Sequence, residues 1–193
     1  MARAERLIVG ISGASGVVYG VRALELLREA GVETHLVMSK SAELTLAYET
    51  RLKLKAVHAL ASKVYRQEDI GAAIASGSFP ILGMLVAPCS IRSLAEIATG
   101  VTSTLLTRAA DVTLKERRRL VLMVRETPLH LGHLRAMTAV TEIGAIVMPP
   151  VPAFYARPAS VADIVTQSVG RALDLFGFEL GAVKRWSGKP SQS

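Results

Sequence analysis

Two hydrophobic patterns alternate along the chain. Short apolar runs, each followed by glycine, proline or polar residues, predict buried β-strands at 7–11, 34–38, 84–87, 120–124 and 145–148. Segments with apolar residues at helical spacing lie between these runs. They predict helices over 17–30, 42–49, 90–98, 103–116 and 131–143, and from Ser160 to about residue 176. Residues 52–78 predict a short strand near Val64 between two helices, the second near 70–75.

Near-continuous apolar strands separated by amphipathic helices are typical of a parallel sheet covered on both faces. Right-handed crossovers then give a doubly wound, Rossmann-like or flavodoxin-like α/β fold. The length of 193 residues suits one domain. We therefore expect a single domain over residues 1–183 and a basic, polar tail over residues 184–193.

The unusual residues of the chain follow the predicted strands. They are the glycines and serines of 10–16, Ser39, the segment 88–90, Arg125 with Glu126, and the proline-rich segment 149–158. Sheets of this class bind ligands at the carboxyl ends of their strands. Five strand ends are therefore expected to point polar or special-backbone residues at one crevice.

The net charge of +7 is confined to two stretches. Residues 108–125 hold six basic and two acidic side chains (+4), and the tail holds three basic side chains and no acid (+3). A nucleic-acid site would combine basic residues with aromatic ones. The chain has only nine aromatic residues, and none lies near Arg117, Arg118 and Arg119, so these three are expected at the surface or at a subunit contact and no nucleic-acid partner is expected.

Membrane and secreted classes also fit poorly. No apolar run approaches the ~20 residues that a membrane helix needs. The apolar run near the N-terminus is too short for a signal peptide. Cys89 is the only cysteine, which excludes an intrachain disulfide and favours a reducing, cytoplasmic compartment.

The first loop, GISGASG at 10–16, suggests a phosphate ligand. Its glycines allow close approach, the following helix N-terminus attracts anions, and Ser12 and Ser15 add hydroxyl donors. It is not the dinucleotide fingerprint, because Ser12 replaces the second glycine and no acid follows the second strand. This favours FMN over NAD. The alternative is a tight turn without a ligand.

Other motifs leave two interpretations open. Ser90 caps a helix and its amides suit an anion, whereas Cys89 is expected to be an inert packing residue. Arg108 and Lys115 share a helix face, either as a cradle for a phosphate or as a solvated face with an Asp111–Lys115 ion pair. His130 and His133 lack further ligands for a metal, so a structural role at a helix N-terminus is favoured.

Six segments together resemble one family. GISGASG at 10–16, THLVMSK at 34–40, PCSIRSLAEIATG at 88–100, LLTRAADVTLKERR at 105–118, VRETPLHLGHL at 124–134 and MPPVPAFYARP at 148–158 are similar to the UbiX flavin prenyltransferases. The similarity runs from about Arg6 to Trp186, with the motifs in family order and spacing. FMN-containing cysteine decarboxylases share the fold, but the PCSIRS segment differs from their asparagine-bearing motif.

The resemblance implies an enzyme that joins a dimethylallyl group from dimethylallyl phosphate to N5 and C6 of reduced FMN. The product, prenylated FMN, serves UbiD-type decarboxylases in ubiquinone or aromatic acid pathways. The family uses no metal for the transfer and forms homododecamers with flavin at subunit interfaces. The alternative function is an FMN-dependent decarboxylase that acts directly on a carboxylated substrate.

The resemblance also implies roles for individual residues. The expected FMN contacts are Gly13, Ala14, Ser15, Ser39, Ser90, Ile91, Arg92, Ser93 and Arg125. The polar site around the prenyl phosphate matches Glu49, Arg108, Lys115, Glu126, Tyr155 and Arg171. Ser15, Glu49, Arg108, Lys115 and Glu126 are the expected catalytic residues; Ser15, Glu49, Glu126 and the released phosphate are alternative final proton acceptors. Trp186 is expected either to form an aromatic wall for the allylic cation or to pack the tail.

Overall fold

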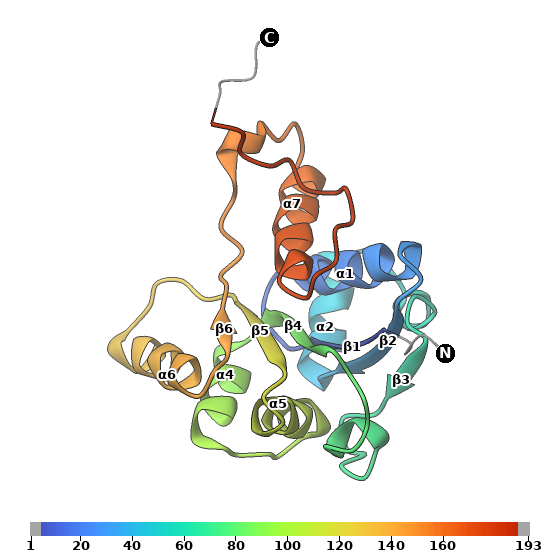
Figure 1. Cartoon of the computed structure of the whole chain (residues 1–193), viewed down its shortest axis with the longest axis vertical. Coiled ribbons are helices and arrows are strands. Elements are labelled where there is room, and N and C mark those ends of the chain that lie inside the picture. Colours follow the sequence, from blue (N-terminus) through green and yellow to red (C-terminus); the bar gives the residue numbers. More distant parts are fainter. Residues whose placement is uncertain (1–4, 189–193) are drawn as a thin grey trace.

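The computed structural model describes residues 5–188, which contain one parallel six-stranded sheet (Figure 1). Its order is β3-β2-β1-β4-β5-β6, the order of a Rossmann sheet. Without the three-residue edge strand β3, the order is that of flavodoxin, so both expected fold names describe this sheet. The strands are β1 (Arg6–Ile11), β2 (Glu33–Met38), β3 (Lys63–Tyr65), β4 (Gly83–Cys89), β5 (Arg119–Val124) and β6 (Ile146–Val147).

The helices match the predicted pattern with two differences. They are α1 (Val17–Glu29), α2 (Lys40–Glu49), α3 (Leu54–His58), α4 (Ile91–Thr99), α5 (Leu105–Lys115), α6 (Leu131–Glu142) and α7 (Val161–Asp174). The helix expected near 70–75 is only the 3₁₀ turn η1 (Ala73–Ala75), between Gly71 and Gly77. A second 3₁₀ turn, η2 (Phe154–Ala156), interrupts the proline-rich segment.

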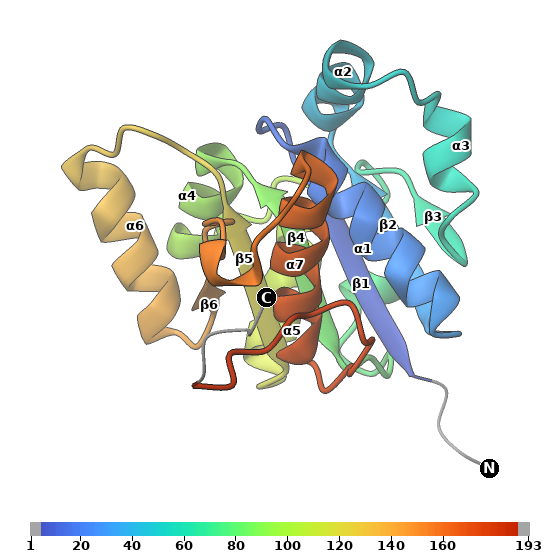
Figure 2. The ribbon, with the colours of Figure 1, turned by 90° about the horizontal axis from the view of Figure 1, so that it is seen from above.

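Alternate residues of each strand face two separate cores. Leu7, Val9 and Ile11 of β1 pack with α1 and α7, whereas Ile8 packs on the other face with α4, α5 and α6. Figure 1 shows the sheet between these two groups of helices, and Figure 2 shows the same layers from above. Burial on both faces explains why the strands read as continuous apolar runs.

Serine and threonine caps fix where the helices begin. Ser39 accepts a hydrogen bond from the Ala42 amide at the start of α2, and Ser90 accepts one from the Ser93 amide at the start of α4. Ser160 caps α7, as the sequence predicts. Because each of the first two caps directly follows a strand, the N-termini of α2 and α4 lie at the carboxyl edge of the sheet.

The chain leaves this body after β6. Figure 1 shows the segment that carries η2 running away from the sheet before α7 returns to pack along α1. We call residues 148–160 the arm. Its side chains Val151 and Phe154 are 72% and 75% exposed, so these apolar residues of the arm lack cover within their own chain, whereas Ala156 is buried.

Candidate functional site

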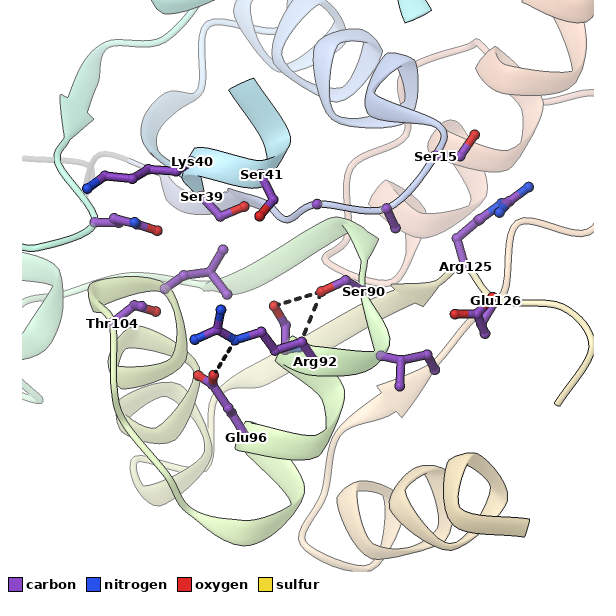
Figure 3. Close-up of a pocket in the computed structure, with 16 residues that line it drawn as sticks. Ser15, Ser39, Lys40, Ser41, Ser90, Arg92, Glu96, Thr104, Arg125 and Glu126 are labelled. Atoms are coloured by element: carbon purple, nitrogen blue, oxygen red, sulfur yellow. Dashed lines mark hydrogen bonds and ion pairs between the residues drawn. The ribbon is translucent and has the colours of Figure 1, made fainter. Parts of the chain in front are cut away.

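A cavity of about 500 Å³ lies at the carboxyl ends of β1, β2, β4 and β5. Its volume is in the usual range for small-molecule sites. Figure 3 shows Ser39, Lys40 and Ser41 at one end of the cavity and Ser15, Arg125 and Glu126 at the other. The lining residues are Gly13, Ala14, Ser15, Ser39, Lys40, Ser41, Gln67, Ser90, Ile91, Arg92, Ser93, Glu96, Thr104, Leu106, Arg125 and Glu126. Four of the five predicted strand ends therefore converge, and the segment 149–158 does not join them.

The first loop lies directly against the start of α2. A Cβ atom on Gly13 would stand 2.2 Å from the Cβ atom of Ser41, so only glycine permits this close approach. Gly16 has a φ of 99°, in the left-handed region that glycine adopts without strain. These two glycines account for the shape of the wall formed by residues 13–15.

The N-terminus of α1 is already satisfied by a carboxylate. Glu49 Oε2 accepts hydrogen bonds from the amides of Gly16 (2.8 Å) and Val17 (3.2 Å). The expected attraction of this helix end for the ligand phosphate is therefore not supported in the isolated chain, because an anion of the protein occupies the amides. Glu49 itself lies behind the first loop and is not among the residues that line the cavity.

The expectation that the Ser12 hydroxyl faces a ligand is wrong. Ser12 is 1% exposed; its hydroxyl donates to the Pro88 carbonyl (3.0 Å) and accepts from the Ser90 amide (2.7 Å). Backbone bonds from Ser39 to Ile11 and from Arg125 to Cys89 join the other neighbouring strand ends. The walls of the cavity are thus connected laterally, beyond the ends of the regular ladders.

Charged side chains of both signs face the cavity. The Arg92 Nε–H donates to Glu96 (2.9 Å) and the Lys40 ammonium pairs with Glu68 (3.0 Å). Burial raises the pKa of Glu96, but hydrogen bonds from Ser103 and Arg92 outweigh it, so that pKa is lowered overall. Arg125 has no ion-pair partner among residues 5–188 and is available to an anionic ligand. Hydroxyls, helix N-terminal amides and the unpaired Arg125 guanidinium suit a phosphorylated ligand such as FMN.

Arg108 and Lys115 do not form a joint cradle within one chain. Arg108 pairs with Asp111 (2.8 Å) and Lys115 with its neighbour Glu116, so the alternative Asp111–Lys115 pair is also wrong. Seven residues of helix separate Arg108 from Lys115 by about 10 Å along the axis of α5. Lys115 lies beside Gly77, at the edge of the sheet opposite the cavity, and neither cation lines the cavity.

Tyr155 and Arg171 belong to the arm and α7. The Tyr155 ring packs edge-on against Trp186 with centroids 5.8 Å apart, and its hydroxyl accepts a hydrogen bond from Gln167. Arg171 pairs with Asp174, which also binds Arg185 of the tail. Lys189, the last base of the predicted tail, lies outside the described residues. Neither Tyr155 nor Arg171 lines the cavity of its own chain.

The thiol of Cys89 is not activated as a nucleophile. It is fully buried, and burial raises its pKa to about 12, so the nucleophilic thiolate is strongly disfavoured. This confirms the expectation of a packing cysteine. Arg118 is a structural residue, because its guanidinium donates to the carbonyls of Phe79 and Gly77; Arg117 and Arg119 are exposed.

His130 and His133 lie at the N-terminus of α6. His130 caps the helix by accepting a hydrogen bond from the His133 amide, as expected. Within residues 5–188, no three His, Cys, Asp or Glu side chains gather as metal ligands would. In the same part of the chain, no helix has both the length and the apolar character of a membrane span.

Comparison with known proteins decides the family. The protein-family model described as "Flavoprotein" matches residues 1–173. A flavin prenyltransferase UbiX from Escherichia coli (strain K12) is 58% identical over 187 residues, which cover 95% of this chain and 99% of that protein. The chain belongs to the UbiX family of flavin prenyltransferases. The sequence resemblance is thereby confirmed.

Two solved UbiX structures share the whole fold. A UbiX protein in complex with FMN and dimethylallyl pyrophosphate has a TM-score of 0.95, with 51% identity over 97% of this chain and 100% of that one. A structure from Escherichia coli O157:H7, described as a dodecameric FMN-dependent UbiX-like decarboxylase, has a TM-score of 0.92, with 49% identity over 95% of this chain and 100% of that one.

The UbiX cavity contains residues that the sequence did not single out. Lys40 and Ser41 follow Ser39 at the start of α2. Their position just after a strand could have predicted that they line the cavity. Glu96 lies one turn after Arg92, a spacing that predicts an ion pair but not its place in a cavity. Gln67, Thr104 and Leu106 reach the cavity only through tertiary contacts, among them the bond from the Leu105 amide to the Gln67 carbonyl.

Proposed function

We propose that this chain transfers the dimethylallyl group of dimethylallyl phosphate to N5 and C6 of reduced FMN, and releases prenylated FMN. One observation carries the proposal. All nine residues that family resemblance assigns to FMN line a single cavity, although they come from four segments spread over residues 13–125. The parallel sheet brings the four strand ends to one edge, and the cavity at that edge has the volume of a small-molecule site.

The residues of the cavity suit the parts of FMN. Amides and hydroxyls at the starts of α2 and α4 can hold the phosphate and ribityl oxygens. Ile91 and Leu106 offer apolar surface to a planar ring, and Arg125 offers a free guanidinium. Reduced flavin, when bound, supplies the electron-rich nucleophile, so the protein need not provide one. Orientation of the two substrates then accounts for much of the expected acceleration.

We further propose that the prenyl-phosphate half of the site comes from neighbouring copies. Arg108, Lys115, Tyr155 and Arg171 do not line the cavity of their own chain. The arm is apolar and exposed, and one close relative is described as dodecameric. A homododecamer that places the arm, α5 and α7 of neighbouring copies around the cavity of another would bring these four residues to that cavity and cover the exposed arm.

The chemistry of an allylic phosphate fits these residue types. Breaking the C–O bond leaves negative charge on the phosphate and positive charge on the allyl group. Arg108, Lys115 and Arg171 would stabilise the departing phosphate, and Tyr155 would donate a hydrogen bond to it. Glu49, Glu126 and Ser15 are the side chains available to accept the proton lost when the new ring closes at C6.

The proposed product indicates its user. Prenylated FMN is the cofactor of UbiD-type decarboxylases, so such an enzyme in the same compartment, here the cytoplasm, is the proposed acceptor. The proposed prenyl donor is the monophosphate, although the relative with a solved complex holds the pyrophosphate.

A mass measurement tests the proposal. The protein is mixed anaerobically with reduced FMN and dimethylallyl phosphate, and the flavin is analysed by mass spectrometry. A flavin heavier by one C5 unit is expected, with an equal amount of inorganic phosphate. Absence of this product would overturn the proposal. Release of CO2 from a carboxylated substrate by the protein alone would also overturn it, and would favour direct decarboxylation. A parallel reaction with the pyrophosphate separates the two donors.

A further inference from the structure

The side chain of Ser12 connects two walls of the cavity without touching its interior. Ser12 directly precedes Gly13, at the beginning of one wall, and contacts Pro88 and Ser90, at the beginning of another. It is 1% exposed and does not line the cavity. Its one proton goes to the Pro88 carbonyl, so none is left for a ligand.

The hydroxyl acts where the regular ladder has ended. The last paired residues of β1 and β4 are Gly10 and Val86, and β4 shifts its register toward β5 between Val86 and Cys89. The Ser90 amide therefore has no strand partner on the β1 side. The Ser12 hydroxyl replaces that partner at 2.7 Å, while the Ser12 amide donates to the Pro88 carbonyl at 3.2 Å.

Loss of the hydroxyl would affect both walls together. Ser90 is the N-cap of α4, and its own hydroxyl accepts the Ser93 amide, so the position of Ser90 sets that of the wall 90–93. A partly buried amide left without an acceptor favours local movement that exposes it to water. Such movement would change the spacing between the walls 13–15 and 90–93.

We propose that Ser12 is a positioning residue for flavin binding, whose buried hydroxyl fixes the spacing between the walls 13–15 and 90–93. This rests on the proposed binding of FMN between these walls. It does not depend on which group is later transferred.

Thr34 provides a matched control. It is also 1% exposed, and its hydroxyl also accepts a loop amide, that of Ser62 at 3.1 Å. Thr34 belongs to β2, at the amino edge of the sheet and away from the cavity. Thr34→Ala therefore removes the same kind of bond as Ser12→Ala without altering the walls.

The test compares the two variants in three measurements. Fluorescence titration with FMN is expected to show a Kd about tenfold higher for Ser12→Ala, and a change within about twofold for Thr34→Ala. Amide hydrogen exchange is expected to accelerate in peptides covering 13–16 and 90–93 only in Ser12→Ala. With FMN saturating, the concentration of dimethylallyl phosphate that gives half the maximal rate should not change.

Three outcomes would overturn the proposal: an FMN Kd for Ser12→Ala within twofold of the wild type, an equal loss in Thr34→Ala, or unchanged exchange at both walls. If Ser12→Ala does not fold, Ser12→Cys keeps a weak acceptor and should show an intermediate Kd; wild-type affinity in that variant would also overturn the proposal. A failure of prenyl transfer with normal FMN binding in the wild type would contradict the proposed function and leave this inference intact.

Discussion

The Glu49 carboxylate accepts a hydrogen bond from the Gly16 amide at 2.8 Å, across 33 residues of sequence. Because Gly16 has no side chain, α1 cannot be capped by its own N-cap residue, and α2 supplies the cap. The carboxylate thus lies against the back of the loop that forms the flavin wall. The Glu49 carboxylate caps α1 and is also a proposed proton acceptor, so variants are needed that separate these two roles.

Glu49→Gln and Glu49→Ala make that separation. The amide of glutamine still accepts from Gly16, so we expect Glu49→Gln to keep most of the thermal stability, whereas Glu49→Ala should lower Tm by about 2–4 °C. Both should reduce prenyl transfer at least about 100-fold if Glu49 accepts the proton. The measurements are thermal unfolding and product mass. Near-wild-type turnover by Glu49→Gln would assign Glu49 to capping alone.

Arg171→Ala should affect the prenyl phosphate and leave FMN in place. Removal of a cation that contacts a phosphate is expected to raise the KM for dimethylallyl phosphate about tenfold or more, with the FMN Kd within about twofold. Arg185→Ala is the matched control, because Arg185 shares the partner Asp174 but has no proposed contact with substrate. Parallel losses of FMN and prenyl phosphate binding in titrations would contradict the assignment.

Mixed oligomers test whether two copies build one site. Arg125→Ala damages the cavity and Arg171→Ala damages the α7 contribution, so each variant alone should be much slower than the wild type when dimethylallyl phosphate is held below the wild-type KM. If each site combines the cavity of one copy with α7 of another, coexpression should restore about a quarter of the sites by random mixing. If both groups came from the same chain, no intact site would form. Product formation by the purified mixture is the measurement.

Stability should fall in mildly acidic solution because of His35. This side chain is 2% exposed, with one ring nitrogen 2.8 Å from the Tyr65 hydroxyl and the other 3.0 Å from Glu33. Burial lowers the pKa of His35, against the opposing effect of Glu33. Below the ordinary pKa of 6.5, the unfolded chain takes up a proton that the folded chain does not, so the free energy of unfolding decreases.

The measurement is Tm between pH 7.5 and pH 5.5 for the wild type and His35→Gln. The wild type should lose stability across this range, and the variant should show a flatter dependence. The Arg6 hydrogen bond lowers the pKa of Glu33, so its contribution is lost only as the pH falls below about 4.5, outside this range. An unchanged slope in His35→Gln would refute the assignment.

Local pattern sufficed for the sheet and for the convergence of its ends. Strands such as β1 are apolar on both faces, which predicts a parallel sheet. Because parallel strand ends share an edge, the sequence also predicts that Gly13, Ser39, Ser90 and Arg125 lie close together. The sequence did not predict hydrogen bonds between residues that are distant along the chain. No local signal joins Glu49 to Gly16 or the Ser12 hydroxyl to Ser90, because tertiary packing alone creates those contacts.

The arm could not be placed for a different reason. Its prolines predict an extended segment, but their pattern does not say whether that segment folds back over its own sheet or extends away from it. The answer depends on surfaces that the single chain leaves exposed. Tyr155 therefore follows a strand end in sequence and still lies away from the crevice.

Helix α7 carries a proposed substrate-binding residue and also forms part of the core. Arg171 lies on the same helix as Val169 and Leu173, which are fully buried in the core against α1. A chain truncated before α7 would keep every residue that lines the cavity, since the last of them is Glu126. It would also uncover the apolar side of α1 and become a target for proteolysis. A chain that ends before α7 is therefore expected to be degraded rather than to persist as a flavin-binding protein without transferase activity.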